Sequence, residues 1–349
     1  MRIDQLTFTR FIAAISIVIF HYGEHIPPFN HPAISYLFRN ANLGVNYFFV
    51  LSGFVMILAY GGYSHISAAT YLKNRFARVY PVYLFAILLL LLYMIAGSNP
   101  IDYTGLVLNI TLLQAWVPGK AFSFNYPGWS LSVEALFYLA FPFLVNKVYS
   151  QYKYSTLLLP FAILWLCTQL LAEYAIHSTF YQGFGTPSHD AIYHFPLMHI
   201  NEFLLGNLAG YYFINKLHNK ARTTDLYILA IGIFIAIVLM FNIGMNYHNG
   251  LLSIVFIPII LLYAVNNGVI TKLSSLPVCI FLGEISYGVY ILQWPVFAWV
   301  RGIFRHFNIQ HHELYFYTSF LTLIALSALS YTYIETPLRK YIKSRSIKL

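Results

Sequence analysis

Ten long apolar stretches constrain the fold of this chain more than any other feature of its sequence. Each is close to the roughly 20 residues that an α-helix needs to cross the hydrocarbon core of a bilayer. Of the 349 residues, 59% are hydrophobic and 9% are charged, whereas soluble domains carry about 25% charged residues. The sequence therefore predicts an all-α polytopic membrane protein with about ten transmembrane helices. Their predicted ranges are 8–26, 43–61, 79–96, 129–146, 154–174, 196–215, 225–243, 250–267, 278–300 and 314–335.

Residues 104–117 form an eleventh, shorter apolar segment, and the basic residues decide whether it crosses. If it does not cross, only four basic residues face outward, and the other 16 of the 20 Lys and Arg face the cytoplasm. If it crossed, all later segments would invert and the basic C-terminus would face outward, against the positive-inside rule. We therefore predict a re-entrant or partial segment at 104–117 and both termini in the cytoplasm. The four outward residues are Arg39, Lys120, Arg301 and Arg305.

The formal net charge of +9 does not indicate a nucleic-acid-binding protein, because the basic residues lie in short clusters between apolar runs. Cys167 and Cys279 each lie inside an apolar segment, in no spacing that predicts a disulfide framework or a zinc site. The first apolar run lacks a small-residue cleavage site, so we interpret it as an uncleaved first span. No polar stretch is long enough to fold alone, and we predict one membrane-embedded domain over residues 1–349.

Arg10 and His21 place a cation and a titratable ring in the first predicted span. Eleven residues separate them by roughly 16 Å along a helix, and because this is close to three turns both side chains face the same side. Ionisable groups within a membrane span are expensive to bury and are functional by default. The alternative is that Arg10 is only an interfacial anchor and His21 only the polar end of the helix.

Arg75 and Arg78 are spaced i, i+3 and share a helix face at the predicted cytoplasmic surface, on the same side of the membrane as Arg10. Two guanidinium groups on one face suit bidentate binding of phosphate. The alternative is that Arg75 and Arg78 belong to a cluster of positive charges on the cytoplasmic side that only fixes the topology. Together with His21, the three arginines favour a long, thin substrate with a phosphorylated head over a compact ion.

Glu134 follows the turn Pro127-Gly128 and lies one to two turns inside the fourth predicted span. Burying its ionised carboxylate would cost several kcal/mol unless it is paired or faces water. Glu202 is likewise just inside the sixth span. By the predicted topology His21, Glu134 and Glu202 lie toward the outer half and could converge on one polar cavity. The alternative is that Glu134 has a structural role, as the partner of a cation or a hydroxyl.

Ser52 is a rival nucleophile, but it lacks the Gly-x-Ser-x-Gly elbow, and Gly53 beside it favours a close approach of two helices. The outer loops at 175–199 and 301–313 are rich in histidine. No fixed ligand spacing supports a metal site there, so we interpret them as polar aromatic loops at the membrane surface.

Seven motifs in this order resemble those of the acyltransferase 3 family of membrane acyltransferases, which includes bacterial sugar O-acetyltransferases. The resemblance implies about ten helices and transfer of an acyl group, usually acetyl, from cytoplasmic acyl-CoA to a hydroxyl of a glycan or lipid-linked sugar. It also implies a bacterial inner membrane. Many members add an extracytoplasmic domain, whereas this chain ends soon after Arg339, so the need for a partner protein stays open. The motifs are Arg10 with His21, Gly44–Phe54, Arg75–Pro81, Trp129–Leu131 with Glu134, Glu202–Gly206, Gly283–Gly288 through Trp294-Pro295, and Glu335–Pro337 with Arg339.

The family's Arg-x10-His pair maps onto Arg10 and His21, and its Arg-x-x-Arg motif maps onto Arg75 and Arg78. We therefore expect the three arginines to hold the acyl-CoA phosphates. His21 is expected to act as the base on the acceptor hydroxyl or to take the acyl group briefly itself. Glu134 is expected to orient His21 if the two are close.

Trp129, Glu202 and Ser52 are predicted substrate-binding residues, and no metal is expected. The expected partners are acyl-CoA, a glycan or lipid-linked sugar acceptor, and membrane lipids. The alternative function is a proton-coupled transporter or flippase for a glycolipid or organic anion, with His21, Glu134 and Glu202 as a proton relay. The sequence does not indicate the oligomeric state.

Overall fold

The computed structural model describes residues 3–63, 65–241 and 244–345. In this part of the chain the secondary structure is helical, and the only β-type pairing is an isolated bridge between Arg222 and Asn266. The prediction of an all-α fold is therefore confirmed.

A helix lies in each of the ten ranges predicted to span the membrane. Six helical stretches of the described chain are long and apolar enough to cross a bilayer, while α10 and α11 are apolar but shorter. Residues 242–243 of one predicted span lie outside the described residues. The ten helices are α1 (Gln5–Tyr22), α3 (Gly44–Tyr60), α4 (Ala68–Ala96), α6 (Trp129–Phe143), α7 (Tyr154–His177), α9 (Ile200–Tyr212), α10 (Asp225–Met240), α11 (Ser253–Val265), α13 (Pro277–His306) and α14 (His312–Ser330).

Shorter elements connect or extend these helices. Three π-helical turns continue α6, α9 and α14, and the last of them leads into α15. Two 3-10 turns frame the region before α6: η2 (Gln114–Trp116) and η3 (Tyr126–Gly128). The short α-helices are α2 (Ser35–Arg39), α5 (Tyr103–Ile110), α8 (Pro187–Tyr193), α12 (Val269–Ser274) and α15 (Thr336–Ser344).

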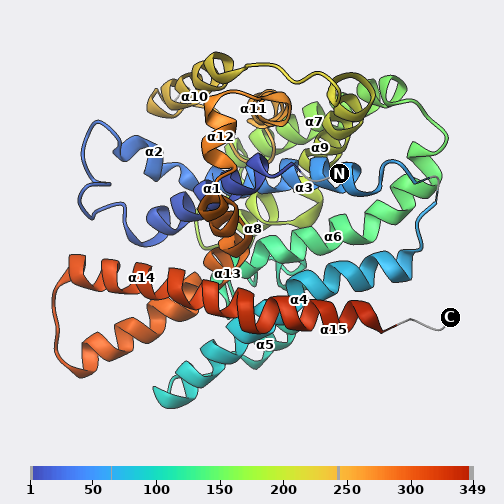
Figure 1. The fold of residues 1–349 in the computed structure, drawn as a ribbon. Coiled ribbons are helices and arrows are strands. Elements are labelled where there is room, and N and C mark those ends of the chain that lie inside the picture. The colour runs from blue at the N-terminus through green and yellow to red at the C-terminus, as the bar shows by residue number, and fades with distance from the viewer. Residues whose placement is uncertain (1–2, 64, 242–243, 346–349) are drawn as a thin grey trace.

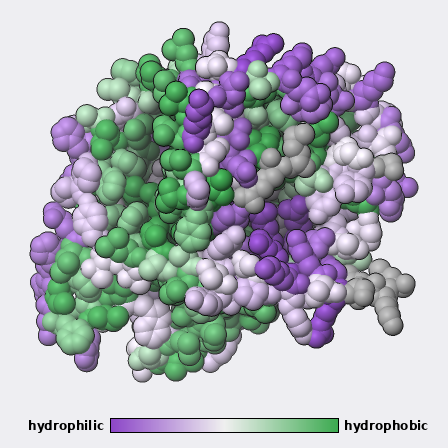
Figure 2. All heavy atoms as spheres, in the orientation of Figure 1, coloured by the Kyte–Doolittle hydropathy of each residue, from purple (hydrophilic) through white to green (hydrophobic). Residues whose placement is uncertain are grey.

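Many large apolar side chains are exposed on the outside of the bundle. On α7, Leu159, Leu170 and Tyr174 are 67%, 62% and 75% exposed. Figure 2 shows hydrophobic side chains over much of the left and lower parts of one face of the molecule. A helix that is hydrophobic all round must be covered by protein or by lipid. Since these side chains are exposed, the fold is that of a multi-pass membrane protein.

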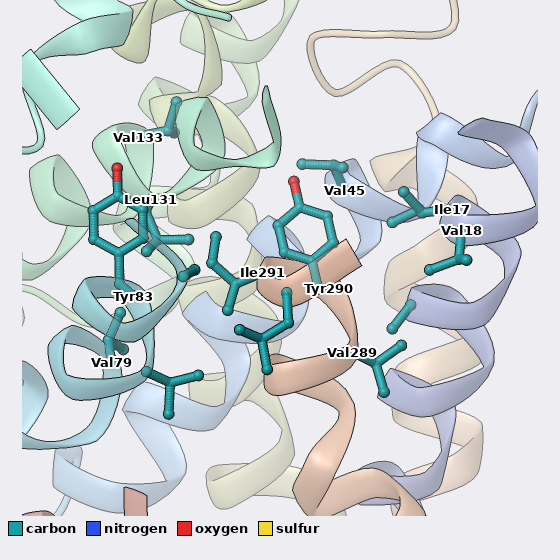
Figure 3. Packing of buried hydrophobic residues seen from close by; sticks show 14 of the residues in the cluster. Ile17, Val18, Val45, Val79, Tyr83, Leu131, Val133, Val289, Tyr290 and Ile291 are labelled. Atoms are coloured by element: carbon teal, nitrogen blue, oxygen red, sulfur yellow. The ribbon is translucent and has the colours of Figure 1, made fainter. Parts of the chain in front are cut away.

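Helices α1 and α3 lie at the centre of the bundle (Figure 1), and the long helix α13 packs against α1. Figure 3 shows part of the core around α13, where the ring of Tyr290 points toward Val45 of α3. This core matters for function because α1, α3 and α13 carry most of the side chains of the site described below.

The crossing of α3 and α9 depends on two glycines. A Cβ atom on Gly53 would lie 2.2 Å from the carbonyl oxygen of Phe203, and one on Gly206 would lie 2.1 Å from that of Val50. Both contacts are to backbone, which cannot turn aside as a side chain can. The prediction that Gly53 permits a close approach of two helices is therefore confirmed.

The segment predicted not to cross folds as α5, followed by a turn and η2. Eight helical residues extend only about 12 Å, far less than the bilayer core. Several of its buried polar groups bond within the protein, although Gln114 Oε1 has no partner among the described residues. The hydroxyl of Tyr83 donates to Asn109 Oδ1 at 2.9 Å, and Gln114 Nε2 donates to the carbonyl oxygen of Gly128 at 2.6 Å. Irregular backbone at membrane depth requires this internal bonding.

Candidate active site

Five of the residues predicted from the sequence line one cavity between α1, α3, α4, α6 and α13, which we call the arginine cavity. It encloses about 880 Å³, including its mouth. Because these side chains come from four helices, their convergence is a property of the tertiary fold. The five residues are Arg10, Ser52, Arg75, Arg78 and Glu134.

The arginine cavity is electropositive. Arg10, Arg75 and Arg78 contribute three positive charges against the single carboxylate of Glu134, and all three act on it electrostatically. The hydroxyl of Ser52 donates a long hydrogen bond of 3.4 Å to Glu134 Oε1. A surplus of guanidinium groups in a partly enclosed cavity favours an anionic ligand.

Arg75 is held by aromatic rings rather than by an acid. Its guanidinium carbon lies 5.4 Å, 5.3 Å and 6.0 Å from the ring centroids of Tyr60, Tyr71 and Tyr138. Its buried Nε has no hydrogen-bond partner in the part of the chain that the structure describes. An unsatisfied buried donor is costly, so this group is available to an anion that enters the cavity.

A second cavity adjoins the first and shares Arg10, Leu51, Val55 and Arg78 with it. It adds Arg339 of α15, whose guanidinium lies 3.5 Å from the carboxylate of Glu335. Arg339 was absent from the predicted site, although it belongs to the last motif of the resemblance. Glu284 lines the same cavity, so Arg339 adds a cation toward the C-terminal helix in a cavity that also contains an acid.

His21 has a defined tautomer. Its Nδ1 lies 2.7 Å from Gln293 Oε1, and Gln293 Nε2 donates to the carbonyl oxygen of Tyr290 at 2.6 Å. Because the carbonyl can only accept, the amide nitrogen of Gln293 must face it, and the amide oxygen must face His21. Nδ1 of His21 therefore carries the proton, and Nε2 keeps its lone pair.

Glu134 was expected to orient His21 only if the two were close, and the structure gives His21 another partner. Gln293 of α13 is the partner of the His21 ring, whereas Glu134 lies among the arginines. His21 itself is not part of the lining of the arginine cavity. Sequence reasoning missed Gln293, and the available signal was a neutral amide inside an apolar span.

His21, Glu134 and Glu202 could have converged on one polar cavity, and of these three only Glu134 is among the described residues that line the arginine cavity. Glu202 is completely buried, with Asn46 Nδ2 at 2.5 Å from one carboxylate oxygen and His199 Nδ1 at 2.7 Å from the other. Both oxygens are satisfied, so the geometry favours a packing role for Glu202 over contact with substrate.

Trp129 lies beside the arginine cavity, in an aromatic layer with histidines of the loop at 175–199. Its ring centroid is 4.7 Å from that of His194 and 5.5 Å from that of His199. These histidines bond to neighbouring acids, His194 to Asp190 and His199 to Glu202. The layer is therefore packed and internally bonded.

Asp190 joins α8 to the loop that precedes α6. Its Oδ2 accepts hydrogen bonds from the backbone N–H groups of Gly119 and Ala121, at 2.8 Å and 3.2 Å, and its Oδ1 lies 3.1 Å from His194 Nδ1. Burial opposes ionisation, but these hydrogen bonds and His194 outweigh it and hold the pKa of Asp190 below its usual range.

We expect Asp190→Asn to lower the free energy of unfolding by about 1–3 kcal/mol, because an amide cannot replace all the acceptor positions of a buried carboxylate. A carboxylate with a depressed pKa stabilises the fold fully above its unfolded-state pKa of about 3.9 and loses this effect only at lower pH. The loss should therefore be the same at pH 6 and pH 8. Thermal unfolding in detergent measures it, with the exposed Glu313→Gln as control; equal melting temperatures would contradict the assignment.

The family model and the related proteins named below, which match this chain, are all acyltransferases. A family model described as an acyltransferase domain matches residues 3–334. The acyltransferase MdmB of Streptomyces mycarofaciens is 31% identical over 189 residues, 50% of this chain and 46% of its own length. The O-acetyltransferase OatA of Staphylococcus aureus is 26% identical over 359 residues, 95% of this chain and 56% of its own. The chain thus spans about half the length of these relatives, and no solved structure matches.

Proposed function

This chain belongs to the acyltransferase 3 family, and on that premise we propose that it transfers an acyl group, most simply acetyl, from acyl-CoA to a hydroxyl of a cell-surface polysaccharide or lipid-linked sugar. The observation that carries this proposal is the arginine cavity, which combines Arg10, Arg75 and Arg78 next to the region of His21. A relative named O-acetyltransferase aligns with 95% of the chain, which supports acetyl as the group transferred.

The donor is acyl-CoA, a long thin molecule with phosphates at one end and the thioester at the other. Its phosphates bind Arg10, Arg75 and Arg78, with Arg339 at the approach from the second cavity. The unpaired Nε of Arg75 and the charge surplus of the cavity support this assignment. The pantetheine arm then extends along α1 toward His21, roughly 16 Å from Arg10 along the helix.

His21 is the general base. Its Nε2 removes the proton of the acceptor hydroxyl as the oxygen attacks the thioester carbon, and Gln293 keeps the proton on Nδ1. Gln293 is thus a positioning residue, in the place that Glu134 was expected to take. Glu134 and Ser52 instead shape the polar wall of the donor cavity.

The protein lies in the inner membrane with about ten spans and both termini in the cytoplasm. Helices in all ten predicted ranges, together with an α5 too short to cross, support this arrangement. It places the arginines at the cytoplasmic end, where acyl-CoA is available, and His21 toward the opposite side, where a surface glycan is exposed. The transporter alternative gains no support, because its three relay residues do not share the arginine cavity.

Membrane vesicles of opposite orientation test the proposal. Labelled acetyl-CoA does not cross a bilayer, so we expect alkali-labile label in the glycan of inside-out vesicles and little in right-side-out vesicles. Vesicles from a strain without the gene are the control. Label that appears only in right-side-out vesicles, where acetyl-CoA reaches the outer face of the membrane, would contradict the topology. No label in either kind of vesicle would contradict the reaction.

A further inference from the structure

Two hydroxyl groups line the arginine cavity and are not among the described residues that line the second cavity. Ser130 of α6 and Tyr290 of α13 both line the cavity, and their hydroxyl oxygens are 2.9 Å apart. Both also reach the carbonyl oxygen of Pro127 in η3, at 3.1 Å and 3.2 Å. A hydroxyl turns about its C–O bond at little cost, so each can direct its proton into the cavity.

Tyr290 also connects this part of the cavity wall with His21. The backbone carbonyl of Tyr290 fixes the amide of Gln293, which in turn bonds to His21. On the other side, the ring of Tyr126, next to Pro127, meets the His21 ring edge to face at 5.1 Å between centroids. Tyr290 therefore connects the wall of the arginine cavity with the partner of His21, and Ser130 is bonded to Tyr290.

We infer that the Ser130 and Tyr290 hydroxyls bind the thioester carbonyl oxygen of the donor and stabilise the oxyanion that forms on it. The inference rests on the proposed function and adds to it the group that stabilises negative charge. Donors directed at a developing oxyanion supply a large part of the rate enhancement in acyl transfer, and here the two hydroxyl protons turn from the Pro127 carbonyl to that oxygen.

The step is balanced as follows. His21 Nε2 takes the proton of the acceptor hydroxyl, whose oxygen forms a bond to the thioester carbon, and the carbonyl electron pair moves onto oxygen. Ser130 and Tyr290 donate hydrogen bonds to this oxyanion. The pair then returns, the C–S bond breaks, and the CoA thiolate takes the proton from His21. The products are an ester and free CoA, and no other reactant is required.

The test compares Tyr290→Phe and Ser130→Ala in membranes that carry the cell's own acceptor, supplied with labelled acetyl-CoA. We expect each variant to lower the maximal rate about 100-fold, with the apparent KM for acetyl-CoA within threefold of the original. Ser130→Thr, which keeps a hydroxyl, should recover most of the rate. Binding of S-ethyl-CoA, a thioether with no carbonyl, should be unchanged in Tyr290→Phe.

Tyr315→Phe is the matched control, because it also removes a tyrosine hydroxyl bonded to a backbone carbonyl, that of Phe297 at 3.0 Å, but away from the cavity. It should leave the rate within threefold. Rates are normalised to folded protein by thermal unfolding. If Tyr290→Phe or Ser130→Ala keeps a maximal rate within threefold of the original, the inference about the oxyanion is overturned. The proposed function is not affected by that result, because the His21→Ala variant tests it separately. Unaltered protein that transfers no label would overturn both.

Discussion

Gly206→Ala should abolish or severely reduce the amount of folded protein in the membrane. The new Cβ would lie 2.1 Å from the carbonyl oxygen of Val50 and 3.0 Å from its carbonyl carbon. Neither atom can move without separating α3 from α9. Overpacking of a core costs about 1–3 kcal/mol and more where backbone must shift, so we expect at least the upper end of this range.

Gly232→Ala is the matched control for that experiment. Gly232 is also a helical glycine, in α10, and a Cβ there has no neighbour within 4 Å. Alanine in a helix is more stable than glycine by about 0.5–1 kcal/mol, so this variant should be neutral or slightly stabilised. Thermal unfolding and membrane abundance measure both. Equal behaviour of the two alanine variants would show that α3 and α9 do not cross as closely as described.

His21→Ala should reduce acyl transfer by at least about 10²–10⁴-fold, the usual contribution of a general base. The fold should persist, because the His21 side chain lies at the end of α1 and its hydrogen bond among the described residues is to the neutral side chain of Gln293. The measurement is label transfer from acetyl-CoA in membranes with equal amounts of protein. His31→Ala, at an exposed position, is the control, and transfer within threefold of the original in His21→Ala would exclude His21 as the base.

Gln293 allows the tautomer assignment to be tested separately. Gln293→Leu removes the acceptor of the Nδ1 proton, so both tautomers become available and the rate should fall by less than in His21→Ala. If Gln293 positions His21, the substitution should also change the dependence of the rate on pH. If Gln293 only fills space, the substitution should lower the stability of the protein and leave the pH–rate profile unchanged. An unchanged rate and an unchanged pH–rate profile would exclude a positioning role for Gln293.

The sequence predicted the parts of this structure that depend on helix periodicity and on the cost of burying charge. Arg75 and Arg78 share a face because they are three residues apart, and Arg10 joins them because a buried cation needs a polar cavity. Gly53 marked a close helix crossing for a similar local reason.

The remaining parts depend on which helices are neighbours, and no local pattern contains that information. Gln293 and Tyr290 are neutral residues in an apolar span, so neither charge nor spacing distinguished them. A role of Glu134 in orienting His21 depended on the two being close, which spacing along the chain does not decide, and the carboxylate of Glu134 lies among the arginines. Glu202 was recognised as a costly buried acid, but its partner His199, three residues earlier, was assigned to the surface loop.

Mass spectrometry of the surface glycans tests the central claim most directly. It compares a deletion strain, the same strain with the gene restored, and a strain with His21→Ala at equal membrane abundance. An acetyl-transfer enzyme predicts that an ester-linked acyl group disappears on deletion, returns with the intact gene and stays absent with His21→Ala. A glycan that is missing from the surface and accumulates unmodified inside the deletion strain would contradict the account and identify the protein as a transporter.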